Sequence, residues 1–385
     1  MTLSPDTASL LRDLSDLVAI RSENPPGREV EAADFVAARL RSMGLDVALD
    51  EYKPGRVNVE AKLVNGPGRV FALNTHMDTV PAGEGWASDP FTLTEREGKL
   101  FGRGACDCKG PLAAMLEAVR MLAAMRDAWS GTLLAVFVAD EEIASEGAKH
   151  YAAKRPAIDF AVVGEPTSNT IYSAHKGSLR PLVRVHGVTA HSGTPELGEN
   201  AILRAGQLLG MVAEEHEERV RRRTHPLVGA ASLTVTRIQG GHADNVLPGA
   251  CEMLLDRRMV PGESEEAVKA EIAGLLERAH ARFGLRAEVV AWKATTGGAT
   301  ETAIDRPVVQ KSLAVARQHG VADPGPFGFQ GGCDLVHFRA TGAEGVVIGP
   351  GSLLVAHKPD EFVTRDELIT SSLIYRDTAI ALLQG

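Results

Sequence analysis

Apolar positions near the start of the chain follow helical spacing. Leu10, Leu14 and Leu17 recur every three to four residues, which predicts an amphipathic helix. Its start is expected at Ser4, because a capping hydroxyl before a proline suits the first turn of a helix. A second helical pattern is expected to stop at Gly44, since glycine commonly follows the last turn of a helix. The chain therefore opens with two predicted helices.

Short runs that are apolar on both faces come next and alternate with helical patterns. The expected strands in the first half are 45–49, 56–63, 69–75, 132–139 and 158–164. A helix at about 110–125 separates the third strand from the fourth. The same alternation returns after residue 294, at 308–318, 345–349 and 366–383. Strands that are buried on both faces and separated by helices are typical of an α/β layer with a largely parallel sheet.

The pattern between these two regions is different. It reads strand, strand, long helix, strand, strand, helix, strand, with the two long helices at about 199–223 and 263–283. Two helices on one antiparallel sheet predict a ferredoxin-like α+β unit. We therefore expect a first catalytic segment at 1–172, an inserted domain at 173–293 and a second catalytic segment at 294–385.

Composition narrows the class of protein. The chain has 385 residues and a net charge of −9, with 44% hydrophobic and 24% charged residues, which is typical of a soluble globular protein. Nucleic acid is not an expected partner, because phosphate recognition needs a concentrated basic surface. No apolar run approaches the ~20 residues that span a bilayer, and no signal-peptide pattern opens the chain. Four irregularly spaced cysteines favour a reducing, cytoplasmic location.

One strongly charged run lies within the first long helix of the insertion. In residues 214–223, Glu215 is spaced to pair with Arg219, and Glu217 with Arg221, at i,i+4. This pattern predicts a solvated helix face rather than a binding patch.

Polar and acidic residues gather where the predicted strands end. These residues are His76, Asp78, Glu141, Glu142 and Glu165, with His357 beyond the run 345–349 and Asp107 in the turn before the helix at about 110–125. Ligands of open α/β sheets bind outside the carboxyl ends of the strands, so these positions are expected to converge on one site. Imidazole and carboxylate groups together suit a divalent metal such as zinc.

The spacing within two of these motifs suggests different roles for neighbouring residues. His76 and Asp78 are two residues apart in an extended segment, so both point to the same face and Asp78 can fix the imidazole tautomer. Glu141 and Glu142 would repel each other if both were buried without a cation. Metal ligation by one of them leaves the other free for proton transfer.

The ordered motifs resemble those of the M20 metallohydrolases, which include aminoacylase, carboxypeptidase G2, succinyl-diaminopimelate desuccinylase and acetylornithine deacetylase. The resemblance covers essentially the whole chain. Its blocks are 76–81, 102–110, 140–142, 164–166, 191–192 with 200–201, 245–248, 256–258 with 261–262, and 349–351 before His357. It implies a zinc-exopeptidase-like α/β/α catalytic domain with an inserted ferredoxin-like dimerisation and lid domain.

The resemblance also implies a ligand set for two metal ions. Asp107 would bridge them, His76 and Glu165 would complete one site, and Glu142 and His357 would complete the other. Zinc is the expected metal, at two ions per chain, although cobalt and manganese accept the same donors.

Further roles follow from the same resemblance. Glu141 would take a proton from the attacking water, and Asp78 would orient His76. In the inserted domain, His191 would reach the partner subunit's site of a homodimer and stabilise the oxyanion. Asn245 and Arg258 would grip a substrate carboxylate. Two alternatives are kept for Arg258: it forms a structural ion pair, or the neighbouring Arg257 binds the substrate in its place.

Two cysteines depart from the family pattern. Cys108 stands where the family commonly has Met or Thr, and Cys333 stands where Ser or Thr is more usual in the loop 331–334. Cys106 and Cys108 are not expected to bind metal, since alternating residues point to different sides. Sensitivity to oxidation beside the metals is the expected consequence.

The function expected from these residues is hydrolysis of the amide bond of an N-acyl amino acid or related small amide, in amino-acid metabolism. A metallo-exopeptidase that cleaves short peptides is the first alternative, and an inactive metal-binding relative is the second. Glu141 argues against the inactive relative, because a binding protein has no need of an unligated carboxylate there. A dehydrogenase is disfavoured, because no glycine-rich dinucleotide motif follows an early strand.

Overall fold

The computed structural model describes residues 3–384 and divides into two compact units. Unit 1 takes in the described parts of Met1–Ala174, Glu301–Gly328 and Cys333–Gly385. Unit 2 takes in His175–Thr300 and Phe329–Gly332, and therefore interrupts unit 1 in sequence.

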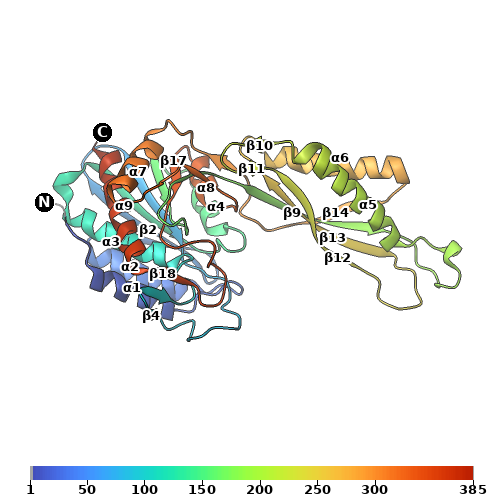
Figure 1. The fold of residues 1–385 in the computed structure, drawn as a ribbon, viewed down its shortest axis with the longest axis horizontal. Coiled ribbons are helices and arrows are strands. Elements are labelled where there is room, and N and C mark those ends of the chain that lie inside the picture. Colours follow the sequence, from blue (N-terminus) through green and yellow to red (C-terminus); the bar gives the residue numbers. More distant parts are fainter. Residues whose placement is uncertain (1–2, 385) are drawn as a thin grey trace. The chain divides into compact units, whose positions relative to one another are not determined.

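A mixed sheet forms the centre of unit 1 (Figure 1), and its strand order is β1-β2-β6-β3-β7-β17-β8-β15. The bounds are β1 Asp46–Lys53, β2 Arg56–Asn65, β3 Val70–His76, β6 Gly131–Val138, β7 Phe160–Val163, β17 Glu344–Val347 and β8 Tyr172–His175. The four central strands β6, β3, β7 and β17 are parallel, while β1, β2 and β8 pair antiparallel with their neighbours. The prediction of a largely parallel sheet thus holds for the centre only. The tight β1–β2 connection can join only antiparallel strands.

Helices pack around this sheet. Their bounds are α1 Thr7–Ala19, α2 Val30–Ser42, α3 Lys109–Ala124, α4 Glu146–Ala153, α7 Pro307–Gln318, α8 Leu335–Ala340 and α9 Arg365–Leu383. Helix α3 is buried along almost its whole length between α1 and α9. The predicted stop at Gly44 is confirmed, because its φ of +84° needs glycine. The predicted cap at Ser4 is wrong: Asp6 caps α1 by accepting a 3.0 Å hydrogen bond from the Ser9 backbone N–H.

A small three-stranded sheet in unit 1 joins distant parts of the sequence. It contains β4 Thr94–Arg96, β5 Lys99–Phe101 and β18 Phe362–Thr364, in the order β18-β5-β4. Pairing of β18 with β5 brings the segment before β18 next to the turn that follows β5. Both segments contribute to the candidate site.

Unit 2 is an antiparallel sheet with two long helices. The bounds are β9 Gly177–His186, α5 Ala201–Glu215, β12 Ser232–Gly240, β13 Ala250–Met259, α6 Glu265–Phe283 and β14 Ala287–Lys293. The spatial order β12-β13-β9-β14 places the first and third strands at the centre. This order, with one helix after the first strand and one after the third, is the ferredoxin-like arrangement, and the prediction is confirmed.

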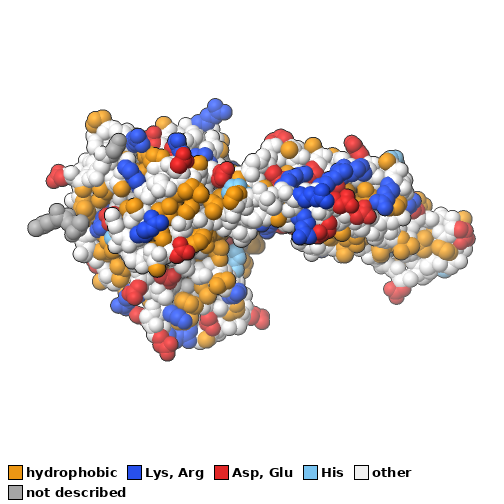
Figure 2. Space-filling view, turned by 45° about the horizontal axis from the view of Figure 1, so that its top comes forward, with side chains coloured by type: hydrophobic (Ala, Val, Ile, Leu, Met, Phe, Trp, Pro, Cys, Tyr) orange, Lys and Arg blue, Asp and Glu red, His pale blue; other side chains and the backbone are white. Residues whose placement is uncertain are grey.

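The charged run at the end of α5 forms ion pairs on the surface. Helix α5 continues as a π-helical turn at His216–Val220. The predicted i,i+4 pairs Glu215–Arg219 and Glu217–Arg221 are both present. Figure 2 shows acidic and basic side chains intermixed on one face of unit 2, as a solvated helix face requires.

Short elements complete the chain: β10 Thr224–His225, β11 Gly229–Ala230, β15 Thr300–Glu301, β16 Phe327–Phe329, and 3₁₀ turns at Arg126–Ala128 and Pro195–Leu197. Strands β10 and β11 pair only with each other, and β16 pairs with β8. Across residues 3–384, no helix is both long enough and apolar enough to cross a bilayer.

Candidate metal centre

Two groups of metal-ligating side chains lie in unit 1 and share one aspartate. The first group, called the buried group, is His76, Asp107, Cys108 and Glu165. The second group, called the open group, is Asp107, Glu142 and His357. Within each group, one ligand atom of every residue lies within 4.8 Å of the others. No other such group of three or more is found among residues 3–384. Every member except Cys108 is a ligand expected from the family resemblance.

The fold explains why residues so far apart in sequence meet. His76 is the last residue of β3, Glu142 follows β6, and Glu165 follows β7. These are adjacent parallel strands, so their carboxyl ends meet at one edge of the sheet. Asp107 comes from the turn before α3, and His357 comes from the loop between β17 and β18.

The two oxygens of Asp107 face different groups. Its Oδ1 lies 3.2 Å from His76 Nε2. Its Oδ2 lies 3.3 Å from His357 Nε2, and the same imidazole nitrogen lies 3.0 Å from Glu142 Oε2. A carboxylate with one oxygen directed to each group is placed to bridge two cations. The nitrogen and oxygen donors on both sides suit divalent metals such as zinc.

The electrostatics of the site favour a bound cation. Burial, together with the charge of Asp107, raises the pKa of Glu165 well above its usual value and also raises the pKa of Glu142. Burial alone would raise the pKa of Asp107, but hydrogen bonds from His357 and His76 outweigh it and hold that pKa well below its usual range. Hydrogen bonds to Asp107 and Glu142 raise the pKa of His357 to about 10. Crowded carboxylates therefore surround positions where divalent cations would relieve their repulsion.

Asp78 is buried and contacts residues of both groups. Its main-chain oxygen lies 2.9 Å from His76 Nδ1, and its Oδ1 lies 3.4 Å from the same nitrogen. The backbone N–H groups of Glu141 and Glu142 donate to its carboxylate at 3.1 and 3.2 Å. Asn24 donates a further hydrogen bond at 2.9 Å, a contact that no sequence pattern predicts. Asp78 thus orients the imidazole through its main-chain oxygen and its carboxylate, and the same carboxylate holds the segment that carries Glu141 and Glu142.

Glu361 holds the backbone of the shared aspartate. The backbone N–H groups of Cys106 and Asp107 both donate to Glu361 Oε1 at 2.9 Å. Arg103 forms a buried ion pair with the other carboxylate oxygen. Sequence reasoning missed Glu361, because the residue reaches the turn only through the distant pairing of β18 with β5.

The Cys108 thiol lies among the ligands of the buried group, although no ligand role is expected for it from the sequence. Its Sγ lies 2.8 Å from Asp107 Oδ1 and 3.4 Å from Glu165 Oε2. The Cys106 thiol instead donates to the main-chain oxygen of Ser352 at 3.5 Å. Strand alternation would put both thiols on the side opposite Asp107. The two thiols instead have different partners, because this segment is a turn and not a strand.

Glu141 lies outside both ligand groups, as its expected role requires. Burial and the charge of Glu165 raise the pKa of Glu141 well above its usual value. Asp334, from the loop after 331, is fully buried and adds to the same negative field, while the neighbouring Cys333 is buried as well.

The remaining predicted site residues belong to unit 2. His191 and Asn245 are exposed on adjacent segments, where the Ser192 backbone N–H donates to the Asn245 main-chain oxygen at 2.9 Å. Arg258 Nε donates to Asp256 at 2.7 Å. The alternative Arg257 is fully buried and ion-paired with glutamates 263 and 271. None of these residues is in either ligand group.

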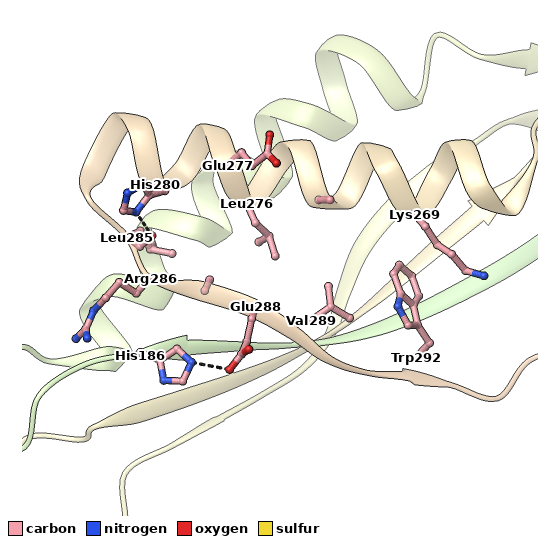
Figure 3. A pocket seen from close by; sticks show the side chains of 12 residues that line it. His186, Lys269, Leu276, Glu277, His280, Leu285, Arg286, Glu288, Val289 and Trp292 are labelled. Atoms are coloured by element: carbon pink, nitrogen blue, oxygen red, sulfur yellow. Dashed lines mark hydrogen bonds and ion pairs between the residues drawn. The ribbon is translucent and has the colours of Figure 1, made fainter.

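Unit 2 also contains a surface hollow of about 750 Å³ between α6 and β14 (Figure 3). Its polar lining is largely self-paired: His186 lies 3.0 Å from Glu288, and His280 Nδ1 contacts the Leu285 main-chain oxygen at 3.1 Å. Trp292 and Leu276 supply apolar surface. The hollow has no convergent set of metal-ligating or nucleophilic groups, so the chemistry is assigned to unit 1.

Comparison with known proteins agrees with this geometry. The model of peptidase family M20/M25/M40 matches residues 72–381. The chain belongs to this family. It is accordingly a metal-dependent hydrolase, and the family resemblance and fold class expected from the sequence are confirmed.

Similar M20 proteins include two acetylornithine deacetylases. The enzyme from Vibrio vulnificus (strain CMCP6) is 31% identical over 373 residues, which cover 94% of each chain. The enzyme from Myxococcus xanthus is 34% identical over 383 residues, covering 94% of this chain and 95% of that protein. The aminopeptidase PepT from Bacillus cereus ATCC 10987 superposes with a TM-score of 0.80 over 98% of this chain and 99% of its own, at 20% identity. That last likeness establishes the shared fold.

Proposed function

We propose that this M20 hydrolase removes the acyl group, with acetyl the first candidate, from an N-acyl amino acid, using two divalent ions per chain. The observation that carries the proposal is the placement of Asp107 between two ligand groups, with one oxygen toward each. The acetylornithine deacetylases that match 94% of the chain support an acylated amino acid as substrate. Zinc is the proposed metal, with cobalt or manganese as substitutes.

The chemistry divides between the metals and the protein. Two divalent ions held by these ligands would lower the pKa of a water molecule and polarise the scissile carbonyl. Glu141 would take the proton from that water and return it to the leaving amine. Asp78 would keep the His76 imidazole in the tautomer that presents Nε2 to the buried group.

Unit 2 is proposed to act as a dimerisation and lid domain. His191 would donate to the developing oxyanion in the partner subunit's site, and Asn245 and Arg258 would bind the substrate carboxylate. The exposure of His191 and Asn245 on adjacent segments supports this assignment. Arg258 is proposed in preference to Arg257, because Arg257 is buried in an ion-pair network.

A cytoplasmic location is proposed as well. All four cysteines are buried and free of disulfides, which suits a reducing compartment.

Hydrolysis by the zinc-loaded protein tests the proposed substrate class. Candidate substrates are N-acetyl, N-succinyl and N-formyl amino acids, with dipeptides and tripeptides as the comparison. We expect N-acyl amino acids to be cleaved with the higher kcat/KM. Faster cleavage of the peptides would favour an exopeptidase instead. Activity that persists in the matched Glu141→Gln protein would come from a contaminant or from another mechanism.

A further inference from the structure

The two ligand groups differ in one donor atom. The open group offers only nitrogen and oxygen, whereas the buried group adds the sulfur of Cys108. All four residues of the buried group are buried. The thiol therefore occupies the same enclosed space as His76, Asp107 and Glu165.

The thiol is near the other donors rather than merely close in sequence. Cys108 Sγ contacts carboxylate oxygens from two different elements, Asp107 in the turn and Glu165 after β7. A cation bound between His76 Nε2, Asp107 Oδ1 and Glu165 would lie within reach of this sulfur, because all four ligand atoms lie within 4.8 Å of one another. These residues would offer the ion one nitrogen, two oxygen and one sulfur donor, a set that suits zinc.

We propose that Cys108 is a direct ligand of the metal ion in the buried group and makes this half of the centre selective for thiophilic ions. Thiolate sulfur favours Zn²⁺, Co²⁺ and Cd²⁺, while Mn²⁺ and Mg²⁺ prefer oxygen. As the metal–sulfur bond forms, the sulfur contributes an electron pair and the thiol proton leaves to solvent. This inference rests on the metal centre proposed above.

The chain contains its own control. Cys106 is equally buried and only two residues away, but its thiol donates to the main-chain oxygen of Ser352 and is in neither ligand group. A Cys106→Ser change therefore perturbs the same turn without removing a proposed ligand. Cys108→Ser removes the sulfur while keeping a small hydrogen-bonding side chain.

Cobalt spectroscopy tests the proposal directly. Metal-free wild-type protein, Cys108→Ser and Cys106→Ser are titrated with Co²⁺, and bound metal is counted by elemental analysis. We expect a near-ultraviolet thiolate-to-cobalt charge-transfer band in the wild type and in Cys106→Ser. The same band is expected to be absent in Cys108→Ser, which should keep its visible ligand-field bands.

The outcomes separate this inference from the proposed function. Two bound Co²⁺ per wild-type chain without a charge-transfer band would overturn the role of Cys108 and leave the metal centre intact. A band that survives in Cys108→Ser would do the same. Failure of the wild type to bind Co²⁺ or Zn²⁺ at all would overturn the metal centre, and Cys108 ligation with it.

Calorimetric titration with Zn²⁺ and with Mn²⁺ measures how strongly each protein prefers one metal over the other. Removal of a residue that only hydrogen-bonds a metal ligand lowers metal affinity at least ~10-fold. Removal of a ligand should cost no less, so Cys108→Ser should weaken Zn²⁺ binding at one site by at least that factor. Its Mn²⁺ affinity and the Zn²⁺ affinity of Cys106→Ser should stay unchanged. Equal losses for Zn²⁺ and Mn²⁺ in Cys108→Ser would contradict thiophilic selectivity and indicate a structural effect.

Discussion

The buried and open groups share Asp107 but differ in one supporting element. In the buried group, His76 is the last residue of one central strand and Glu165 follows another. In the open group, Glu142 also follows a central strand, but His357 comes from a loop, and its side chain is 52% exposed. His357 also has a φ of +63°, a backbone conformation that non-glycine residues seldom adopt.

One metal centre can in this way both retain its ions and admit substrate. Ligands fixed on a packed sheet lose little freedom when they bind a metal, so the buried half should hold its ion more tightly. A ligand on an exposed loop leaves room for substrate and for exchange of the ion. We therefore expect the metal of the open half to leave first under chelation.

The largest effect is expected at Glu141, which belongs to neither group. Glu141→Gln should lower kcat by at least ~10²–10⁴-fold, because the general base is lost. Both metals should remain, since Glu141 is not in either ligand group. Kinetics and elemental analysis on the same preparation check this. Loss of one metal would mean that Glu141, and not Glu142, completes the open group.

The next largest effect concerns His191 in unit 2. His191→Ala should cut kcat ~10²–10³-fold, the usual cost of removing an oxyanion donor, without changing the metal content of either half. Mixing His191→Ala with Glu141→Gln subunits should restore part of the activity, because one hybrid site then has both groups intact. Continued inactivity after demonstrated subunit exchange, or full activity as a monomer, would rule out a histidine that crosses between subunits.

Asp78→Asn should have a smaller effect, a loss of metal affinity. The loss should be greater at the buried group than at the open group. The carboxylate contacts His76 Nδ1, so its replacement should weaken metal binding by the buried group ~10–100-fold. The metal affinity of the open group should fall less, because the Asp78 carboxylate contacts that group only through the backbone N–H of Glu142. Competition with a chelator resolves the two sites. Equal weakening of both halves would show that Asp78 acts through the shared segment and not through the imidazole.

The smallest effect is expected from Glu361, which holds the backbone of the ligand common to both halves. Glu361→Gln keeps one acceptor oxygen but places an amide N–H₂ against Arg103 or the turn. Poorly satisfied buried donors should lower the free energy of unfolding by ~1–3 kcal/mol, measured by urea denaturation of the metal-free protein. Metal affinity should fall by a similar factor in both halves. A loss confined to one half would contradict a role through Asp107.

The parts of the site that the sequence predicted depend on local pattern. His76, Glu142 and Glu165 follow apolar runs, and parallel strands bring their carboxyl ends together whatever the details of packing. The ferredoxin-like unit was predictable for a similar reason, since helical and extended periodicities alternate in a recognisable order. Asp107 and His357 were expected near the same sheet edge, but their assignment as ligands needed the family resemblance, because both lie in loops.

The parts that the sequence did not predict depend on contacts between distant segments. Asn24 reaches Asp78 across 54 positions, and Glu361 reaches Asp107 across 254 positions. Such pairs leave no trace in local hydrophobic spacing. The direction of the Cys108 side chain could not be predicted from strand alternation, because its segment is a turn. The antiparallel strands at the edges of the sheet were not predicted, because an apolar run does not show whether its strand runs parallel or antiparallel to its neighbour.

Anomalous diffraction from crystals of the zinc-loaded protein can test whether Asp107 joins two metal sites. We expect two zinc peaks on opposite sides of Asp107, one at each of its carboxylate oxygens. One peak should lie about 2.0–2.2 Å from the ligand atoms of His76 and Glu165, and the other at the same distance from those of Glu142 and His357. A single peak, or zinc bound away from Asp107, would contradict a shared aspartate that joins a buried half to an open half.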